Sequence, residues 1–193
     1  MSIDHAIKSR VLNKPLPSAD HLRECFMYDP ATGDLTWKER PREHFATEPA
    51  WLAFNDRRAG MAAGWVADKK GYRRVTVNCC DYKVTRVVWK LMTGEEPPHE
   101  IDHKDRDCAN NRWSNLRAAT SRQQSYNRLR TDNSTGYRGV APHGRKWRAM
   151  IKLDGVSWAS SYFDTPEEAS TAYEKAAERL HGEFYRKPQD KEK

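Results

Sequence analysis

Residues 101–127 form a short segment that is rich in side chains able to do chemistry. The segment reads IDHKDRDCANNRWSNLRAATSRQQSYN and holds an Asp-His pair, four Asn, two adjacent Gln and four Arg. It offers little apolar surface for a core. A polar loop between two ordered elements is a common place for a functional site. We therefore ask which reaction these residue types would serve.

Hydrolysis of a phosphodiester suits this set of side chains. The reaction needs a base to activate water, a divalent cation for the charge on the phosphorane, and stabilisation of the leaving oxygen. His103 can act as the base, Asp102 can hold a hard cation through oxygen, and an amide oxygen from a following helix can be a second ligand. Two protein ligands are enough for Mg²⁺, which keeps most of its waters.

The elements expected around this segment are a helix, a strand, a loop, a second strand and a second helix. Apolar residues at helical spacing mark the first helix, and Thr120 or Ser121 is a suitable cap for the second. The expected ranges of these elements are 85–93, 101–103, 104–114, 115–119 and 120–130.

Further upstream, the sequence predicts a helix and then an irregular stretch. The helix follows Ser18 or Asp20 as its cap, includes Phe26 and Met27 at helical spacing, and stops at Pro30. Residues rich in Pro, Glu and Arg then predict a loop with little internal order at positions 40–60.

Short strands are expected on both sides of that stretch. Leu35 and Trp37 alternate after a turn at Gly33 and predict one strand. Residues 63–84 predict a β meander with turns at Lys70-Gly71 and around Asp81.

The last part of the chain has the pattern of three strands and one helix. The strands are expected at 137–142, 146–153 and 156–163. Thr165 is a suitable N-cap for the helix, with Pro166 in its first turn and Glu168 closing a capping box. The helix has one apolar face, so the sheet is expected to pack against it.

The charge of the chain is concentrated in its middle. The formal net charge is +7, whereas residues 103–152 alone hold twelve Lys and Arg against three Asp. Such a basic block indicates a polyanionic partner. The four Cys form no C-x-x-C pair, so a zinc ribbon or knuckle is not expected. No apolar run is long enough for a membrane span or has the form of a signal peptide, so we expect a cytoplasmic protein without a membrane partner.

The central segment resembles the HNH (ββα-metal, His-Me finger) endonucleases, especially the phage and intron-encoded homing types. The resemblance covers about residues 20–130. The residues in register with that family are Asp102-His103, Asp105, Asn110-Asn111, Asn115-Leu116-Arg117, Thr120 and Asn127.

The resemblance assigns roles to several of these residues. It implies that His103 is the general base, that Asp102 is a metal ligand and that Asn115 braces the catalytic loop. The cofactor it implies is Mg²⁺, with Mn²⁺ as the alternative. The helical metal-ligand Asn of the family falls on Gln124, which is one methylene longer, and Asn127 is the alternative ligand. A phage- or prophage-encoded protein in a bacterial host is also implied.

The last part of the chain resembles the plant Apetala/ethylene-response-factor DNA-binding domain over residues 134–187. The shared features are YRGV, KWRAMI and an aromatic residue before TPEEASTAY. In that family the sheet enters the major groove of DNA. The departures are Ala141 and Met150, which stand where the family has Arg and Glu and which imply a changed or relaxed sequence preference. Trp147 is expected either in this groove or in the core.

The two resemblances together predict an α+β protein. A ββα-metal HNH hairpin with an N-terminal β meander is followed by a small three-stranded antiparallel sheet packed on one helix. The predicted parts are a flexible arm at 1–17, a nuclease domain at 18–130, a linker at 131–136, a DNA-binding domain at 137–187 and a tail at 188–193.

The predicted function is cleavage of double-stranded DNA. The residues expected to contact DNA are Arg117, Arg122, Arg128, Arg138, Arg145, Lys146, Arg148 and Lys152. A DNA-binding protein of HNH ancestry with weak or no activity is the alternative, because Gln124 departs from the family. An RNA-binding accessory protein is a third hypothesis, which the absence of a base-stacking aromatic run disfavours.

Overall fold

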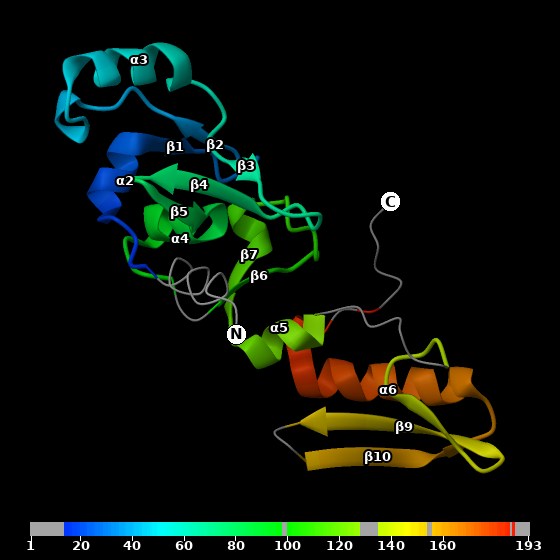
Figure 1. The fold of residues 1–193 in the computed structure, drawn as a ribbon. Helices are drawn as coiled ribbons and strands as arrows, with labels where there is room; N and C mark the ends of the chain where they lie inside the picture. Colours follow the sequence, from blue (N-terminus) through cyan, green and yellow to red (C-terminus); the bar gives the residue numbers. More distant parts are fainter. Residues whose placement is uncertain (1–13, 98–99, 128–134, 154–155, 186, 188–193) are drawn as a thin grey trace, which may run out of the picture. The chain divides into compact units, whose positions relative to one another are not determined.

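The computed structural model is a mixed α+β protein that divides into two compact units, residues 1–119 and 120–193. The structure describes residues 14–97, 100–127, 135–153, 156–185 and 187 (Figure 1). Most of the predicted arm, linker and tail lies outside these residues, so the predicted domain boundaries stay predictions. No helix in the described ranges is both long and apolar enough to cross a membrane.

The first unit begins with helix α2 (Ala19–Cys25) and a β hairpin. The Ser18 hydroxyl caps α2 by accepting the His21 amide at 3.2 Å. The expected continuation of the helix beyond Cys25 is wrong, because strand β1 (Phe26–Tyr28) follows at once and pairs with β2 (Leu35–Trp37). The rings of Phe26 and Trp37 lie across this pair, 4.5 Å apart. This cross-strand contact overrides the helical spacing of the apolar residues.

Residues 40–60 are ordered, contrary to the expectation of a loop. They form η1 (Arg42–His44) and α3 (Glu48–Arg58), and Thr47 caps α3 through its side chain. Pro lies in the first turn, where a helix tolerates it. None of the α3 residues is fully buried. Only Phe54 packs against the core, beside Trp37, and it is partly buried, so the helix has no strong apolar pattern that would have predicted it.

The predicted meander is present as a three-stranded antiparallel sheet. Its strands are β3 (Trp65–Val66), β4 (Arg73–Val77) and β5 (Cys80–Lys83), in that order. The second turn lies earlier than expected. Asn78 and Cys79 both have positive φ, so they make the tight hairpin turn, and Asp81 already pairs within β5.

The core of the first unit forms where helix α4 (Val84–Thr93) packs against α2, β4 and β5. Gly94 ends α4 in the left-handed conformation, as predicted. The largest fully buried side chains of the described residues all belong to this core. They are Leu22, Cys25, Val75, Val77, Val84, Val87 and Val88.

The segment richest in candidate site residues follows α4. Strand β6 (Glu100–His103) pairs antiparallel with β7 (Leu116–Ala119), and η2 (Trp113–Asn115) precedes β7. Ile101 and Leu116 join the core of the first unit. The polar loop thus connects the two paired strands β6 and β7.

The second unit contains helix α5, a three-stranded antiparallel sheet and helix α6. Its elements are α5 (Ser121–Asn127), β8 (Val140–His143), β9 (Lys146–Leu153), β10 (Val156–Phe163), α6 (Pro166–His181) and η3 (Gly182–Phe184). Strand β8 begins three residues later than expected, and the predicted turn at 154–155 lies outside the described residues. Thr165 and Glu168 form the predicted capping box.

The sheet of the second unit packs one face on α6 (Figure 1). Ala149 and Ile151 of β9 are buried with Tyr173 and Ala177 of the helix. Gly139 lies beside this contact with a φ of +69°, and a Cβ there would overlap the Tyr173 ring. Only glycine fits this position.

The β1–β2 turn packs against the polar loop of the candidate site. Gly33 has a φ of +83°, and a Cβ on it would lie 2.5 Å from the backbone nitrogen of Arg112. The Trp113 amide donates to the Pro30 carbonyl at 3.2 Å. The turn therefore packs so closely against the loop that a methyl group on Gly33 would not fit.

We expect Gly33→Ala to lower the free energy of unfolding by about 2 kcal/mol or more, because the new methyl would meet backbone atoms and the φ is unfavourable for alanine. Gly60→Ala is the matched control, since Gly60 also has positive φ but an added Cβ would find no atom within 4 Å. It is expected to cost only about 1 kcal/mol. Urea denaturation measures both, and equal losses would contradict the close fit.

Candidate active site

His103 is a buried imidazole that is held by an amide side chain. It is 3% exposed, and its Nε2 lies 3.2 Å from Oδ1 of Asn111. The Nδ2 of the same amide donates to the Ala109 carbonyl at 3.4 Å, which sets Oδ1 toward the ring. Because an amide oxygen only accepts, this bond requires the proton on Nε2 and leaves the lone pair of the neutral ring on Nδ1. His103 can therefore accept a proton through Nδ1.

Asn115 connects the two sides of the loop between β6 and β7. Its Nδ2 donates to Oδ1 of Asp105 at 2.9 Å and to the Asn110 carbonyl at 2.8 Å, while its Oδ1 accepts the Asp105 amide at 3.0 Å. Its backbone carbonyl accepts the Lys104 amide at 2.9 Å. One side chain thus makes three hydrogen bonds inside a loop that has no apolar core of its own. The catalytic consequence of this bracing stays a prediction.

Asp102 forms a buried ion pair with Arg117, which lies opposite it in the hairpin. Nε and Nη2 of Arg117 donate to Oδ2 of Asp102 at 3.0 and 2.8 Å. The side chains of Arg117 and Asp102 are only 9% and 6% exposed. The guanidinium balances the buried carboxylate, whose charge would otherwise be costly. The sequence predicted that Arg117 contacts DNA and that Asp102 binds a metal, and both roles stay predictions.

Tyr28, Tyr72 and Cys108 are protonated groups around the loop. The Tyr28 hydroxyl donates to the Asn111 carbonyl at 2.7 Å, and burial raises the pKa of Tyr28 to about 12. Burial, followed by a hydrogen bond with Cys108, also raises the pKa of Tyr72, whose ring lies 5.9 Å from that of His103. Burial raises the pKa of the Cys108 thiol as well. These groups keep their protons at neutral pH, so they are not bases.

The candidate amide ligands Gln124 and Asn127 lie on α5, in the second unit. Thr120 caps this helix by accepting the Gln123 amide at 3.2 Å, and the Gln123 side chain accepts the Thr120 amide at 2.8 Å. Gln124 is half-buried and Asn127 is buried. Because Asp102 belongs to the first unit, a metal site that joins it to either amide stays a prediction.

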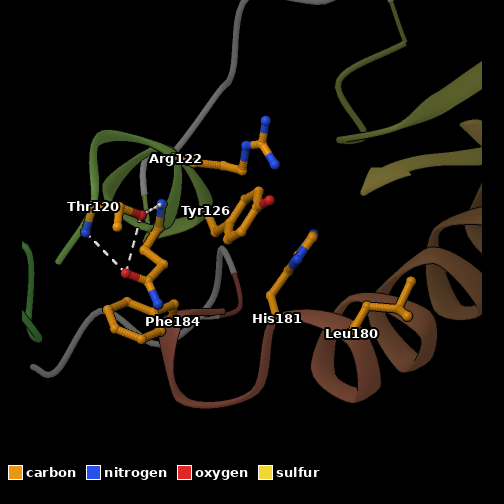
Figure 2. A pocket seen from close by; sticks show the side chains of 7 residues that line it. Thr120, Arg122, Tyr126, Leu180, His181 and Phe184 are labelled. Carbon is orange, nitrogen blue, oxygen red and sulfur yellow. Dashed lines mark hydrogen bonds between the residues drawn. The ribbon is translucent and has the colours of Figure 1, made fainter. Parts of the chain in front are cut away.

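A pocket of 470 Å³ lies beside α5 within the second unit (Figure 2). Its lining residues are Thr120, Arg122, Gln123, Tyr126, Leu180, His181 and Phe184. Tyr126 stacks on His181 with ring centroids 3.7 Å apart. Burial, and next the charge of Arg138, lowers the pKa of His181, so its ring is neutral at neutral pH. Arg122, one of the predicted DNA contacts, is exposed and adds a cation to this aromatic recess.

Arg138 lies against the end of α5. Its guanidinium donates to the carbonyls of Tyr126 at 2.9 Å and Ser125 at 3.3 Å, and it lies 6.0 Å above the ring of Tyr185. A cation at a helix C-terminus compensates the helix dipole. The predicted contact of Arg138 with DNA stays a prediction, and Arg128 lies outside the described residues.

The face of β9 that points away from α6 carries most of the remaining basic residues. Ala149 and Ile151 are buried against α6, so the alternate positions of the strand face the other side. Those positions hold Lys146, Arg148, Met150 and Lys152. Lys146 also pairs with Asp164 at 3.1 Å, and Arg145 is exposed in the turn before the strand. Lys146, Arg148 and Lys152 are among the residues predicted to contact DNA, and that contact stays a prediction.

The sequence analysis did not predict the hydrogen-bond partners of His103 and Asp102, which are Asn111 and Arg117. Asn111 was noted only as one of several loop Asn residues, and Arg117 was expected to face DNA. For Arg117 a signal existed, because the expected strands 101–103 and 115–119 would place a basic residue across from Asp102. For Asn111 the sequence holds no such signal, since the geometry of a polar loop does not follow from spacing.

We expect Arg117→Met to lower the free energy of unfolding by about 3 kcal/mol, because Asp102 would be left as an uncompensated buried charge. Adding Asp102→Asn removes that charge and is expected to recover at least half of the loss. Denaturation curves of the single and double variants measure the coupling. Arg112→Met, at an exposed position, is the control and should change stability by less than about 0.5 kcal/mol. A double variant no more stable than Arg117→Met would contradict the pairing.

Comparisons with known proteins find a family for the segment that holds these residues. Residues 82–126 match the family model described as HNH endonuclease. This range includes α4, the hairpin β6–β7 and most of α5. It ends before the second sheet, and no comparison supports the resemblance of residues 134–187 to the plant DNA-binding domain, which stays a prediction.

One curated relative extends the likeness beyond that range. The chain is 31% identical over 122 residues to a protein of Acanthamoeba polyphaga mimivirus named "Uncharacterized HNH endonuclease L560". The alignment covers 62% of this chain and spans 64% of the relative's length. No solved structure gives a significant match. The central segment of this chain, residues 82–126, is thus similar to the HNH endonucleases.

Proposed function

We propose that this chain is a metal-dependent endonuclease that hydrolyses phosphodiester bonds of duplex DNA. The observation that carries the proposal is the buried His103, held through Nε2 by Asn111, within the segment that matches the HNH family model. In the proposed reaction, Nδ1 of His103 takes a proton from the water that attacks phosphorus. The loop residues keep the ring in the tautomer that this step needs.

Asn115 serves this reaction as a positioning residue. Its three side-chain hydrogen bonds close the loop between Asp105 and Asn110, next to the residue that orients His103. A base must lie within hydrogen-bonding distance of its water, so a small movement of the loop would slow the reaction.

The proposed metal ligands are Asp102 and one amide from α5, either Gln124 or Asn127. A carboxylate with an amide oxygen is a hard donor set, which fits Mg²⁺ or Mn²⁺. When bound, the cation would neutralise charge on the phosphate and stabilise the leaving oxygen. Arg117 would hold the Asp102 carboxylate in place through Oδ2. The longer side chain of Gln124 makes Asn127 a reasonable second choice.

The second unit would supply much of the affinity for DNA. Lys146, Arg148 and Lys152 lie on the open face of β9, and Arg145 precedes it. Positive side chains on one sheet face suit the phosphates and the major groove of duplex DNA. The formal charge of +7 supports the same choice of partner.

A DNA-binding protein with weak or no cleavage is the second candidate. Two observations favour it: Gln124 occupies the expected ligand position, and Arg117 already balances the charge of Asp102. This candidate predicts tight binding to DNA with little or no metal-dependent cutting. A DNA-cleavage assay with a divalent metal therefore distinguishes the two candidates.

We expect supercoiled plasmid to be converted to nicked or linear DNA when Mg²⁺ or Mn²⁺ is present, and to stay intact in EDTA. His103→Ala should reduce the rate by about 100-fold or more, because the base is lost, while DNA affinity stays nearly unchanged. His143→Ala, at an exposed His of β8, is the control at saturating DNA. Full activity of His103→Ala would remove His103 from the mechanism, and binding without cutting in any metal would favour the second candidate.

We expect Lys152→Ala to weaken DNA binding by a similar factor for unrelated sequences and to reduce the slope of log affinity against log salt by about 1, because one phosphate contact is lost. Lys175→Ala, at an exposed position on α6, is the control and should leave the slope unchanged. Equal slopes for the two variants would remove the open face of β9 from the interface.

A further inference from the structure

A second group of metal-ligand side chains lies in the first unit, apart from the polar loop. It consists of His21 and Cys25 on α2 and His44 of η1. One ligand atom from each of the three side chains lies within 4.8 Å of the other two. His21 and Cys25 are four positions apart on a helix, so they share one face. Two elements distant in sequence thus bring together two imidazoles and a thiol.

The distances in this group are close to those of a tetrahedral zinc site. The Cys25 Sγ lies 3.8 Å from Nδ1 of His44. Zinc lies about 2.3 Å from sulfur and about 2.0 Å from imidazole nitrogen, so two such ligands at a tetrahedral angle are about 3.6 Å apart. The rings of His21 and His44 have centroids 4.2 Å apart. Small side-chain rotations would complete the site.

The carboxylate that bonds the far nitrogen of His44 also matches a metal site. Glu24 lies 2.8 Å from Nε2 of His44, which keeps the proton there and leaves Nδ1 as the donor nitrogen that faces Cys25. A carboxylate on the far nitrogen of a ligating imidazole is the common arrangement in zinc proteins.

Arg40 is the group that a cation would have to displace. Its Nε donates to Nδ1 of His44 at 3.2 Å, and Asn78 donates in the same way to Nε2 of His21 at 3.2 Å. Arg40 has other partners, because its guanidinium lies 4.9 Å from the Phe45 ring centre and bonds Asn78 at 3.4 Å. With the metal bound, the Cys25 thiolate and the Glu24 carboxylate balance the two positive charges of the ion.

We propose that His21, Cys25 and His44 bind a zinc ion, distinct from the cation of the nuclease reaction. Binding converts the Cys25 thiol to a thiolate, forms the sulfur–metal bond and releases one proton to solvent. Water completes the four ligands. The ion connects α2 to η1 and so fixes the start of the chain segment that leads into α3. The proposal does not depend on nuclease activity.

Titration of metal-free protein with Co²⁺ tests the site directly. A thiolate–cobalt charge-transfer absorption that saturates at one ion per chain, and that Zn²⁺ but not excess Mg²⁺ removes, is the expected result. Cys25→Ser should abolish the absorption, whereas Cys108→Ser and His103→Ala should keep it. No absorption in the wild type, or its loss in Cys108→Ser with retention in Cys25→Ser, would overturn the proposal.

Glu24→Gln separates a metal site from a purely structural cluster. Glu24 is exposed, so the variant should fold, and loss of the outer carboxylate should weaken zinc binding by about 10-fold or more in a competition titration. Glu39→Gln, at another exposed position of the same unit, is the matched control and should bind as the wild type does. Equal affinities of the two variants would remove Glu24 from the proposed site.

Discussion

The hydrogen bond between His103 and Asn111 is the interaction on which the proposed reaction depends. The loop from residue 104 to 114 has few apolar side chains, of which Trp113 packs against the core beside Trp89, so polar contacts hold the rest of its shape. Asn115 bonds Asp105 and Asn110 within the loop, and the turn at Gly33 packs against the loop backbone. A loop held in this way keeps the imidazole in one tautomer, which is what a general base requires.

The buried pair of Asp102 and Arg117 gives the same hairpin a second constraint. A carboxylate 5% exposed in a protein core is costly unless a cation balances it. Arg117 provides that balance from the opposite strand. The charge beside the loop is thereby balanced before any metal binds. A metal ion at Asp102 would share the carboxylate with the guanidinium, and this competition is what separates the nuclease from the DNA-binding alternative.

Sequence reasoning located most elements whose apolar pattern or caps are strong, such as α4 with its Gly94 end and α6 with its Thr165 cap. It failed at Phe26, where pairing with Trp37 outweighed helical spacing, and at α3, in which no residue is fully buried. In the site, the residue types of the loop singled out Asp102 and His103, and the resemblance to the HNH endonucleases added Asn115. The role of Asn111 depends on loop closure, which residue types and spacing do not encode, whereas the pairing of Arg117 with Asp102 could have been read from the two expected strands.

The most direct test of this account is the tautomer of His103, measured by ¹⁵N-detected NMR of the imidazole nitrogens near neutral pH, with the resonances assigned through His103→Gln. The neutral form of the ring is expected to carry its proton on Nε2, and to be a mixture of tautomers in Asn111→Leu. A neutral ring with its proton on Nδ1 in the wild type would contradict the account, because that nitrogen then has no lone pair with which to accept a proton from water.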